Sequence, residues 1–270
     1  MKLGITTIQR DRGPWIKEWV AFHYLVGFRK FYIYTHKCQD DTIKIVEQLK
    51  NHFDIKSFIV SPELDRAQYH SYNQAYHSFG HEVDWMAFID GDEFLFPTSA
   101  FKIEKVLEEY SDKKLSALAA YWACFGSSGH IEEPTGLIVE NYRYRPNLNW
   151  SGNKHVKSIV CGGQGALINS VVDPHVFQTP LGTFDENMRR IESGVSIYNP
   201  THEKLRINHY MTQSRGYFLN FKQSSGTPMD MSDKPIIRSE EWWKGVDIND
   251  EYDISVEKYI DSLKDILNSI

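Results

Sequence analysis

Short apolar runs alternate with amphipathic stretches along the first 90 residues of the chain. The apolar runs have the length of buried strands and lie at residues 3–8, 28–34, 55–60 and 85–89. Between them, residues 15–27, 42–51 and 64–79 carry apolar side chains at the spacing of a helix, and the first stretch shows one stripe of Trp15, Trp19, Phe22 and Val26. Because strands and helices alternate, the pattern predicts parallel strands joined by right-handed helical crossovers.

The pattern changes after Ser111. Strand-like segments separated by glycine-rich turns follow at residues 115–125, 137–144, 157–160 and 166–168. An amphipathic helix that docks on the domain is expected over residues 254–270, with Ile260, Leu263 and Leu267 on one face. These elements predict an α/β fold of Rossmann-like type, with a mixed, mostly parallel sheet flanked by helices. No repeat, low-complexity tract or clear linker interrupts the chain, so we interpret residues 1–270 as a single domain.

Composition and charge narrow the functional classes. Hydrophobic residues make up 41% of the chain and charged residues 24%, which is typical of a globular protein and excludes a disordered one. The net charge of −6 gives nucleic acid no general reason to bind. No apolar run approaches the ~20 residues of a transmembrane helix, so we expect a soluble protein with at most peripheral membrane contact. Three widely spaced cysteines favour the cytoplasm, including the inner face of a membrane.

Three polar loops follow predicted parallel strands, at residues 9–12, 36–41 and 90–93. Ligands of open α/β sheets bind at the carboxyl ends of the strands, so these loops are expected to form one site. In the third loop, Asp90 and Asp92 flank Gly91, and alternate residues of an extended segment point to the same side. Hard carboxylate oxygens suit Mn²⁺ or Mg²⁺ bridging two phosphates, and glycine lets a phosphate approach the backbone. The loop therefore predicts a site for a nucleotide and a divalent cation.

Several jointly spaced motifs resemble those of GT-A-fold glycosyltransferases of the family 2-like and family 92 type. The resemblance covers residues 3–222, and its motifs are RGPWIKEWVAFHYLVGFRKFYIY, DDT at 40–42, DWMAFIDGDEFLFP, FGSSGH at 125–130 and INHYMTQS at 207–214. It implies a metal-dependent, inverting transfer from a nucleoside-diphosphate sugar, with UDP-galactose as the donor, to a glycan, a lipid-linked saccharide or a polysaccharide precursor. Residues 1–110 would then be the nucleotide-binding half and residues 111–270 the acceptor-binding half.

The resemblance also implies roles for individual residues. Asp90 and Asp92 are the D-x-D pair, Asp92 is the direct metal ligand, and His209 completes the metal site. The residues expected to bind the nucleotide sugar are Thr7, Arg10, Asp11, Arg12, His36, Asp41, Gln68, Asp90, Gly91 and Lys157. Asp11 stands where relatives carry glutamate, so the nucleotide base can differ from uracil. An inverting reaction also needs a base for the acceptor hydroxyl, for which Glu132 and Asp173 are the first candidates.

Other interpretations remain open at the level of sequence. A sugar-nucleotidyltransferase shares the sheet and the metal but attacks phosphorus, and it normally carries a more glycine-rich first loop than QRDRGP. A metal-dependent hydrolase would consume the donor without an acceptor. A non-catalytic saccharide-binding module would use the aromatic side chains, because an indole covers the apolar face of a pyranose. The candidates for such stacking are Trp122, Trp150, Trp242 and Trp243.

Overall fold

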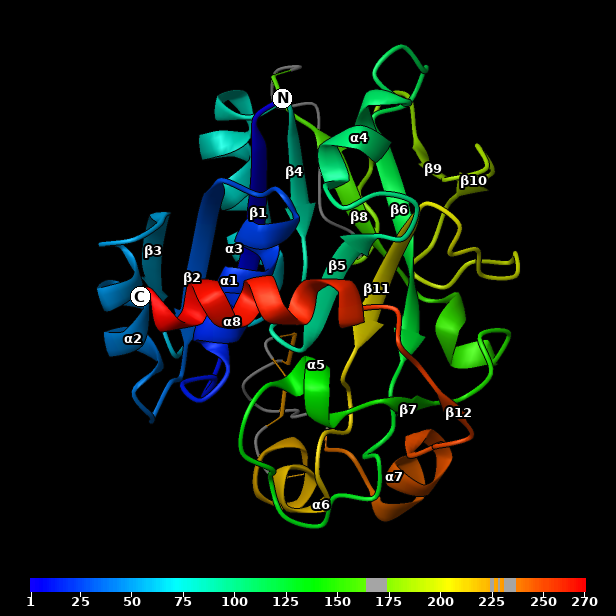
Figure 1. The fold of residues 1–270 in the computed structure, drawn as a ribbon. Helices are drawn as coiled ribbons and strands as arrows, with labels where there is room; N and C mark the ends of the chain where they lie inside the picture. Colours follow the sequence, from blue (N-terminus) through cyan, green and yellow to red (C-terminus); the bar gives the residue numbers. More distant parts are fainter. Residues whose placement is uncertain (164–173, 224–225, 228, 231–236) are drawn as a thin grey trace.

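A mixed β-sheet forms the centre of the computed structural model, which describes residues 1–163, 174–223, 226–227, 229–230 and 237–270 (Figure 1). Its strands lie in the order β10-β9-β6-β8-β4-β1-β2-β3. Their bounds are β1 (Leu3–Gln9), β2 (Lys30–His36), β3 (Asp54–Val60), β4 (Trp85–Phe88), β6 (Ala117–Cys124), β8 (Val156–Cys161), β9 (Thr183–Asp185) and β10 (Arg190–Ile191). The strands β3, β2, β1 and β4 are parallel, as predicted, and β8 runs antiparallel to both β4 and β6.

Helices cover both faces of the parallel part of the sheet. The α-helices of the described residues are α1 (Ile16–Val26), α2 (Thr42–Leu49), α3 (Ala67–Phe79), α4 (Ile103–Glu108), α5 (Ile138–Asn141), α6 (Arg215–Tyr217), α7 (Glu240–Val246) and α8 (Ile260–Asn268). Along β2, Phe31 and Ile33 pack into the cluster that contains α1, whereas Tyr32 and Tyr34 pack with α3. This alternation explains why a strand buried on both faces reads as one continuous apolar run. The predicted α1 stripe is buried, and α8 packs against α1.

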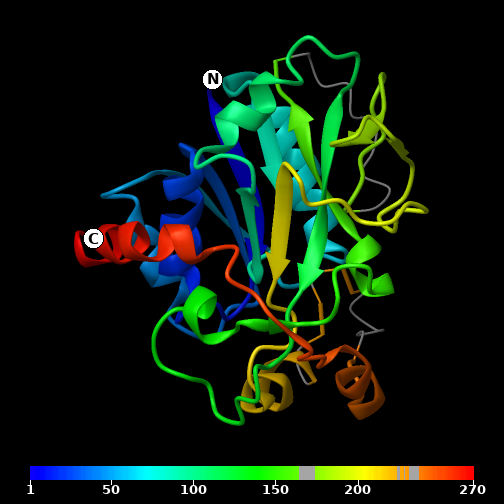
Figure 2. The same ribbon diagram turned by 45° about the vertical axis from the view of Figure 1, so that its right-hand side comes forward.

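Two further strands of the same sheet branch from β6 and connect the two parts of the chain. Strand β5 (Glu93–Pro97) pairs antiparallel with β11 (Leu205–His209), and β11 pairs parallel with β6. The register places His209 opposite Glu93, next to the Asp90–Glu93 loop that connects β4 to β5. In Figures 1 and 2, β6 and β11 point towards the region that contains α6 and α7. The late segments of the chain are therefore brought to the loops that the sequence singles out.

The prediction of a strand at residues 137–144 is wrong. The segment forms the short helix α5, and only its last residue belongs to β7 (Tyr144–Arg145), which pairs with β12 (Glu251–Tyr252). The carboxylate of Glu18 explains the helix, because it accepts the backbone N–H groups of Ile138 and Val139 at 2.8 and 3.0 Å.

The remaining differences concern element ends. The second strand begins two residues later than expected, and the C-terminal helix begins at Ile260 after a 3₁₀ turn at Glu257–Tyr259. The predicted strand at residues 166–168 lies outside the described residues. Within the described part of the chain, no helix combines the length and the apolar character needed to cross a bilayer.

Candidate active site

A cavity of about 290 Å³ lies at the carboxyl ends of β1 and β4. The predicted residues that line it are Arg10, Asp11, Arg12, Gln68, Asp90, Gly91, Asp92 and His209. Further walls come from the segment that follows β11, including Tyr217, Phe221, Lys222 and Arg238, and from Trp122 and His175. The cavity therefore gathers residues from the first loop, the D-x-D loop and the late chain, as an open α/β sheet requires.

Asp90 is held by hydrogen bonds on both of its carboxylate oxygens. Its Oδ1 accepts from Gln68 Nε2 at 2.6 Å and from the Tyr72 hydroxyl at 3.0 Å, while Oδ2 accepts from Lys157 Nζ at 2.7 Å. Trp19 Nε1 donates to the Asp90 carbonyl at 3.1 Å and fixes the turn from below. Burial alone would raise the pKa of Asp90, but the ammonium of Lys157 and the nearby His175 together outweigh it, and the pKa falls. Asp90 is thus an ionised and immobilised carboxylate.

Lys157 does not line the cavity, because its side chain is completely buried beneath it. Its ammonium also lies 3.7 Å from Glu93 Oε1, and Glu93 is itself fully buried. Burial raises the pKa of Glu93 well above its ordinary range, which favours the protonated carboxyl group. With Glu93 protonated, the three groups carry one positive and one negative charge, which is the balance that a buried cluster favours. Lys157 acts through Asp90 and cannot reach a diphosphate directly.

Asp92 has different partners. Lys222 Nζ forms an ion pair with Oδ2, and His209 Nε2 lies 3.5 Å from Oδ1. Burial opposes the charge on Asp92, but Lys222 and His209 more than offset it, and the pKa of Asp92 lies well below its ordinary range. Burial lowers the pKa of His209, so its imidazole is neutral at neutral pH. Asp92 therefore offers a charged oxygen and His209 a neutral nitrogen on the wall of the cavity.

These two residues fit a divalent cation. Carboxylate oxygen and neutral imidazole are ligands that Mn²⁺ accepts, and donor atoms 3.5 Å apart can be neighbouring ligands of one ion. His209 Nδ1 is buried and has no hydrogen-bond partner among the described residues. Asp90 is less suited to direct ligation, because three hydrogen bonds already occupy its oxygens.

Arg12 braces the D-x-D loop. Its guanidinium donates to the Gly91 carbonyl at 3.0 Å, to Gln213 Oε1 at 2.7 Å and to the Tyr217 hydroxyl at 2.8 Å. It also stacks over Trp15 at 4.5 Å. Gly91 packs closely on Gln9, since a Cβ at position 91 would lie 2.2 Å from Gln9 Oε1 and the Gln9 side chain would have to move. Arg12 and Gly91 both line the cavity, and the hydrogen bond between them fixes the position of the D-x-D loop in its wall.

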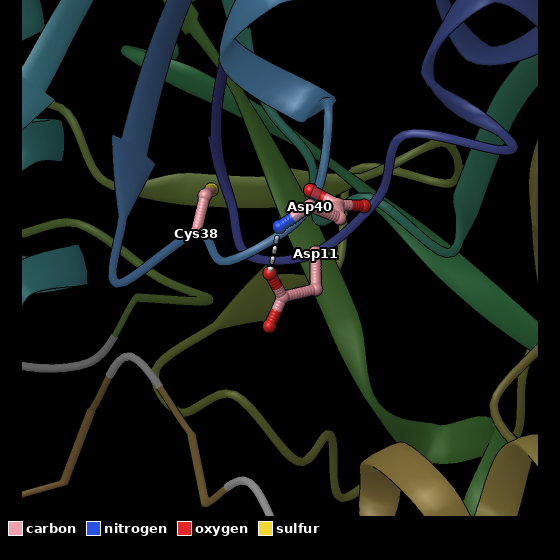
Figure 3. Close-up of side chains that lie close together, drawn as sticks. All are labelled: Asp11, Cys38 and Asp40. Carbon is pink, nitrogen blue, oxygen red and sulfur yellow. Dashed lines mark hydrogen bonds between the residues drawn. The ribbon is translucent and has the colours of Figure 1, made fainter.

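Asp11, Cys38 and Asp40 lie close together where the loops after β1 and β2 meet (Figure 3). Asp11 Oδ1 accepts the backbone N–H groups of Gln39 at 2.6 Å and Asp40 at 3.3 Å. Asp40 Oδ2 accepts the N–H of Gly13 at 2.8 Å, and its Oδ1 accepts from Thr42. These bonds make the group a cross-brace between the two loops. It holds Arg10 and Asp11 at the rim of the cavity.

Several predicted site residues lie away from the cavity. Thr7 is buried in β1, where its hydroxyl accepts from Gln9 Nε2 at 2.7 Å. His36 ends β2 and is buried, and Asp41 is exposed before α2. Glu132 is exposed and is not among the residues that line the cavity. Asp173 lies outside the described residues.

The sequence did not single out Lys222, Tyr217 or Arg238. Lys222 lies at the end of a π-helical segment, Phe218–Lys222, that continues α6. It contacts Asp92 from a position 130 residues further along the chain. No local pattern indicates such a contact, although the resemblance of the INHYMTQS motif just before it implied that His209 belongs to the metal site.

The sheet and its cavity have the arrangement that the sequence resemblance implies for a GT-A fold, and comparison with known proteins gives the family. The model of Glycosyltransferase family 92 matches residues 5–243, so the chain belongs to that family. Family 92 proteins from Ricinus communis and Oryza sativa are 24% and 25% identical to it over 215 residues. These alignments cover 78% and 77% of this chain but only 36% and 33% of the relatives, so the chain spans about a third of their length.

A solved structure, the S. aureus TarS fragment 1–349 in complex with UDP, is 15% identical with a TM-score of 0.36. The match covers 56% of this chain and 39% of that one. Of the interpretations that the sequence leaves open, membership of this family supports glycosyl transfer.

Proposed function

We propose that this chain transfers a sugar, galactose in the first instance, from a UDP-sugar to a hydroxyl group of a glycan or lipid-linked saccharide, with inversion at the anomeric carbon. The observation that carries the proposal is the pair Asp90 and Asp92 on the wall of a cavity at the carboxyl end of β4. Three free cysteines are consistent with action in the reducing cytoplasm.

The charged residues of the cavity suit a diphosphate. Arg10, Lys222 and Arg238 line it and supply positive charge, while Arg12 aligns the D-x-D backbone. Asp92 and His209 would hold Mn²⁺ or Mg²⁺, and such an ion stabilises the negative charge that builds on the departing diphosphate. Asp90, fixed by Gln68 and Lys157, is placed to accept a hydrogen bond from the ribose or from a water molecule.

Calorimetric titration with UDP, GDP, CDP and ADP, each with and without Mn²⁺, tests the proposal. UDP is expected to bind, and to bind at least tenfold more tightly with Mn²⁺. Asp92→Asn should abolish the effect of Mn²⁺ while leaving thermal unfolding nearly unchanged. Asp112→Asn, which removes an exposed carboxylate outside the cavity, is the matched control. Equal UDP affinity with and without the metal would refute metal dependence, and no binding of any diphosphate would refute the donor site.

A further inference from the structure

A second cavity, also of about 290 Å³, adjoins the first. The two share Trp122, His209, Lys222 and Arg238 as walls. The other residues that line the second cavity are Cys124, Trp150, Gly152, His155, Met211, Trp242 and Val246. A molecule bound there would therefore lie beside Asp92 and His209, on the side away from α3 and the first loop.

The walls of this cavity suit a sugar ring. Trp150 lies against the backbone of Gly152, since a Cβ on Gly152 would lie 2.0 Å from the indole. Trp242 stacks on Phe218, with ring centroids 6.0 Å apart, and the guanidinium of Arg238 lies over its indole. Two partly exposed indoles, each held by packing, form rigid apolar faces of the kind that pyranose rings contact.

His155 is a basic group of this cavity that the fold orients. Its Nδ1 lies 2.9 Å from the carbonyl oxygen of Gly152, and a carbonyl only accepts, so Nδ1 carries the hydrogen. In the neutral imidazole, Nε2 then keeps its lone pair. The ring stacks on Trp122, with centroids 4.6 Å apart and planes 14° apart, and Trp122 in turn contacts His209. One indole thus separates His155 from the His209 imidazole.

The described residues that line the second cavity include no carboxylate. His209 faces Asp92, and burial raises the pKa of the Cys124 thiol well above its ordinary range, which leaves that thiol uncharged. Lys222 is paired with Asp92, and an arginine is always protonated. His155 is therefore the proton acceptor that the described walls supply.

Resting on the proposed function, we propose that the second cavity binds the acceptor saccharide between Trp150 and Trp242, with His155 as the catalytic base. The acceptor hydroxyl passes its proton to His155 Nε2 while its oxygen forms a bond to the anomeric carbon. The bond from that carbon to the diphosphate oxygen breaks, and its electron pair leaves with the UDP. The neutral imidazole becomes an imidazolium, and the charges balance.

Binding of octyl β-glycosides of galactose, glucose, N-acetylglucosamine and mannose, measured by calorimetry in the presence of UDP and Mn²⁺, tests the cavity. We expect at least one glycoside to bind, and Trp150→Ala and Trp242→Ala each to weaken that binding about tenfold without changing UDP affinity. Tyr252→Ala, which removes an exposed aromatic ring on β12, is the control and should change neither. Failure of all four glycosides to bind, or unchanged binding in both tryptophan variants, would overturn the assignment.

His155→Asn tests the base, because the asparagine amide can still donate to Gly152 but cannot take up a proton. Using the glycoside that binds, we expect transfer from UDP-galactose to fall 10²-fold or more, with donor and glycoside affinities unchanged. Retained transfer in His155→Asn would overturn the role of His155, as would an equal loss in Asp173→Asn or Glu132→Gln. If wild-type protein binds no UDP, the proposed function itself fails, whereas normal donor binding with unaffected variants overturns this inference alone.

Discussion

The buried ion pair between Lys157 and Asp90 makes a quantitative prediction about stability. Lys157 comes from β8 and Asp90 from the end of β4, so the pair ties two neighbouring antiparallel strands together beneath the cavity. The perturbation is a double-mutant cycle of Lys157→Met, Asp90→Asn and the combination of both. Methionine keeps most of the volume of the lysine stem, so the cycle removes charge with little change in packing.

The expected magnitude follows from the geometry. At 2.7 Å, two unit charges attract by about 6 kcal/mol at an effective dielectric constant of about 20. Much of this is offset by the cost of removing the fully buried ammonium from water. Either single change leaves an uncompensated charge and should cost about 3 kcal/mol or more in unfolding free energy. The double variant leaves neither charge, so a coupling energy of about 2–3 kcal/mol is expected.

Urea unfolding at pH 7, followed by tryptophan fluorescence, measures all four free energies. Lys264→Met is the control, because Lys264 pairs with Glu140 on the surface and its side chain is 48% exposed. That pair should contribute less than about 1 kcal/mol. A coupling energy between positions 157 and 90 below about 0.5 kcal/mol would refute the view that this pair holds the D-x-D loop.

Two further predictions concern pH. His23 is fully buried and neutral, with Nδ1 donating to the Trp19 carbonyl and Nε2 accepting from the Leu95 N–H, and burial lowers its pKa to about 3. Below pH 6.5 the unfolded chain takes up a proton on His23, whereas the folded chain does not. The free energy of unfolding should therefore fall by about 2 kcal/mol between pH 7 and pH 5. In urea unfolding, His23→Gln should remove this part of the pH dependence. Hydrogen bonds from Lys56 and Lys30 outweigh partial burial and lower the pKa of Glu82 to about 2. The ionised Glu82 therefore stabilises the fold above pH 4.5, and this stabilisation is lost towards pH 2. Glu82→Gln should lower the free energy of unfolding by about 1 kcal/mol at pH 7, after solvent screening, and its difference from wild type should shrink below pH 4.

The parallel half of the fold could be predicted because its signals are local. The strands β1, β2 and β4 are buried on both faces, and the apolar stripe of α1 indicates that this helix packs against a sheet. The D-x-D loop was identified for the same reason, since it directly follows a run that only a central strand explains. Where the polar or apolar character of each residue reflects its own burial, the sequence pattern is sufficient to predict the element.

Contacts between distant segments were not predictable in this way. Residues 137–144 read as a strand, but Glu18 caps α5 from 120 residues away. Glu18 lies within the apolar pattern of α1, and nothing around it indicates that its carboxylate is directed at two backbone N–H groups. The contacts of Arg12 were not predictable either, because its partners Gln213 and Tyr217 lie some 200 residues later.

The D-x-D motif illustrates how surroundings assign different roles to identical side chains. The residue pattern alone does not distinguish Asp90 from Asp92, and only the family resemblance singled out Asp92 as the direct metal ligand. In the structure, Asp90 is bound to a lysine with no exposed surface, whereas Asp92 pairs with Lys222, which lines both cavities. Loss of the Asp90 carboxylate leaves the buried Lys157 with only the more distant Glu93 carboxyl group beside it, so its main effect falls on stability. Loss of the Asp92 carboxylate leaves Lys222 next to solvent, which costs little folding free energy. The main effect of this change therefore falls on metal-dependent nucleotide binding. Asp90→Asn and Asp92→Asn should therefore separate unfolding free energy from metal-dependent UDP affinity.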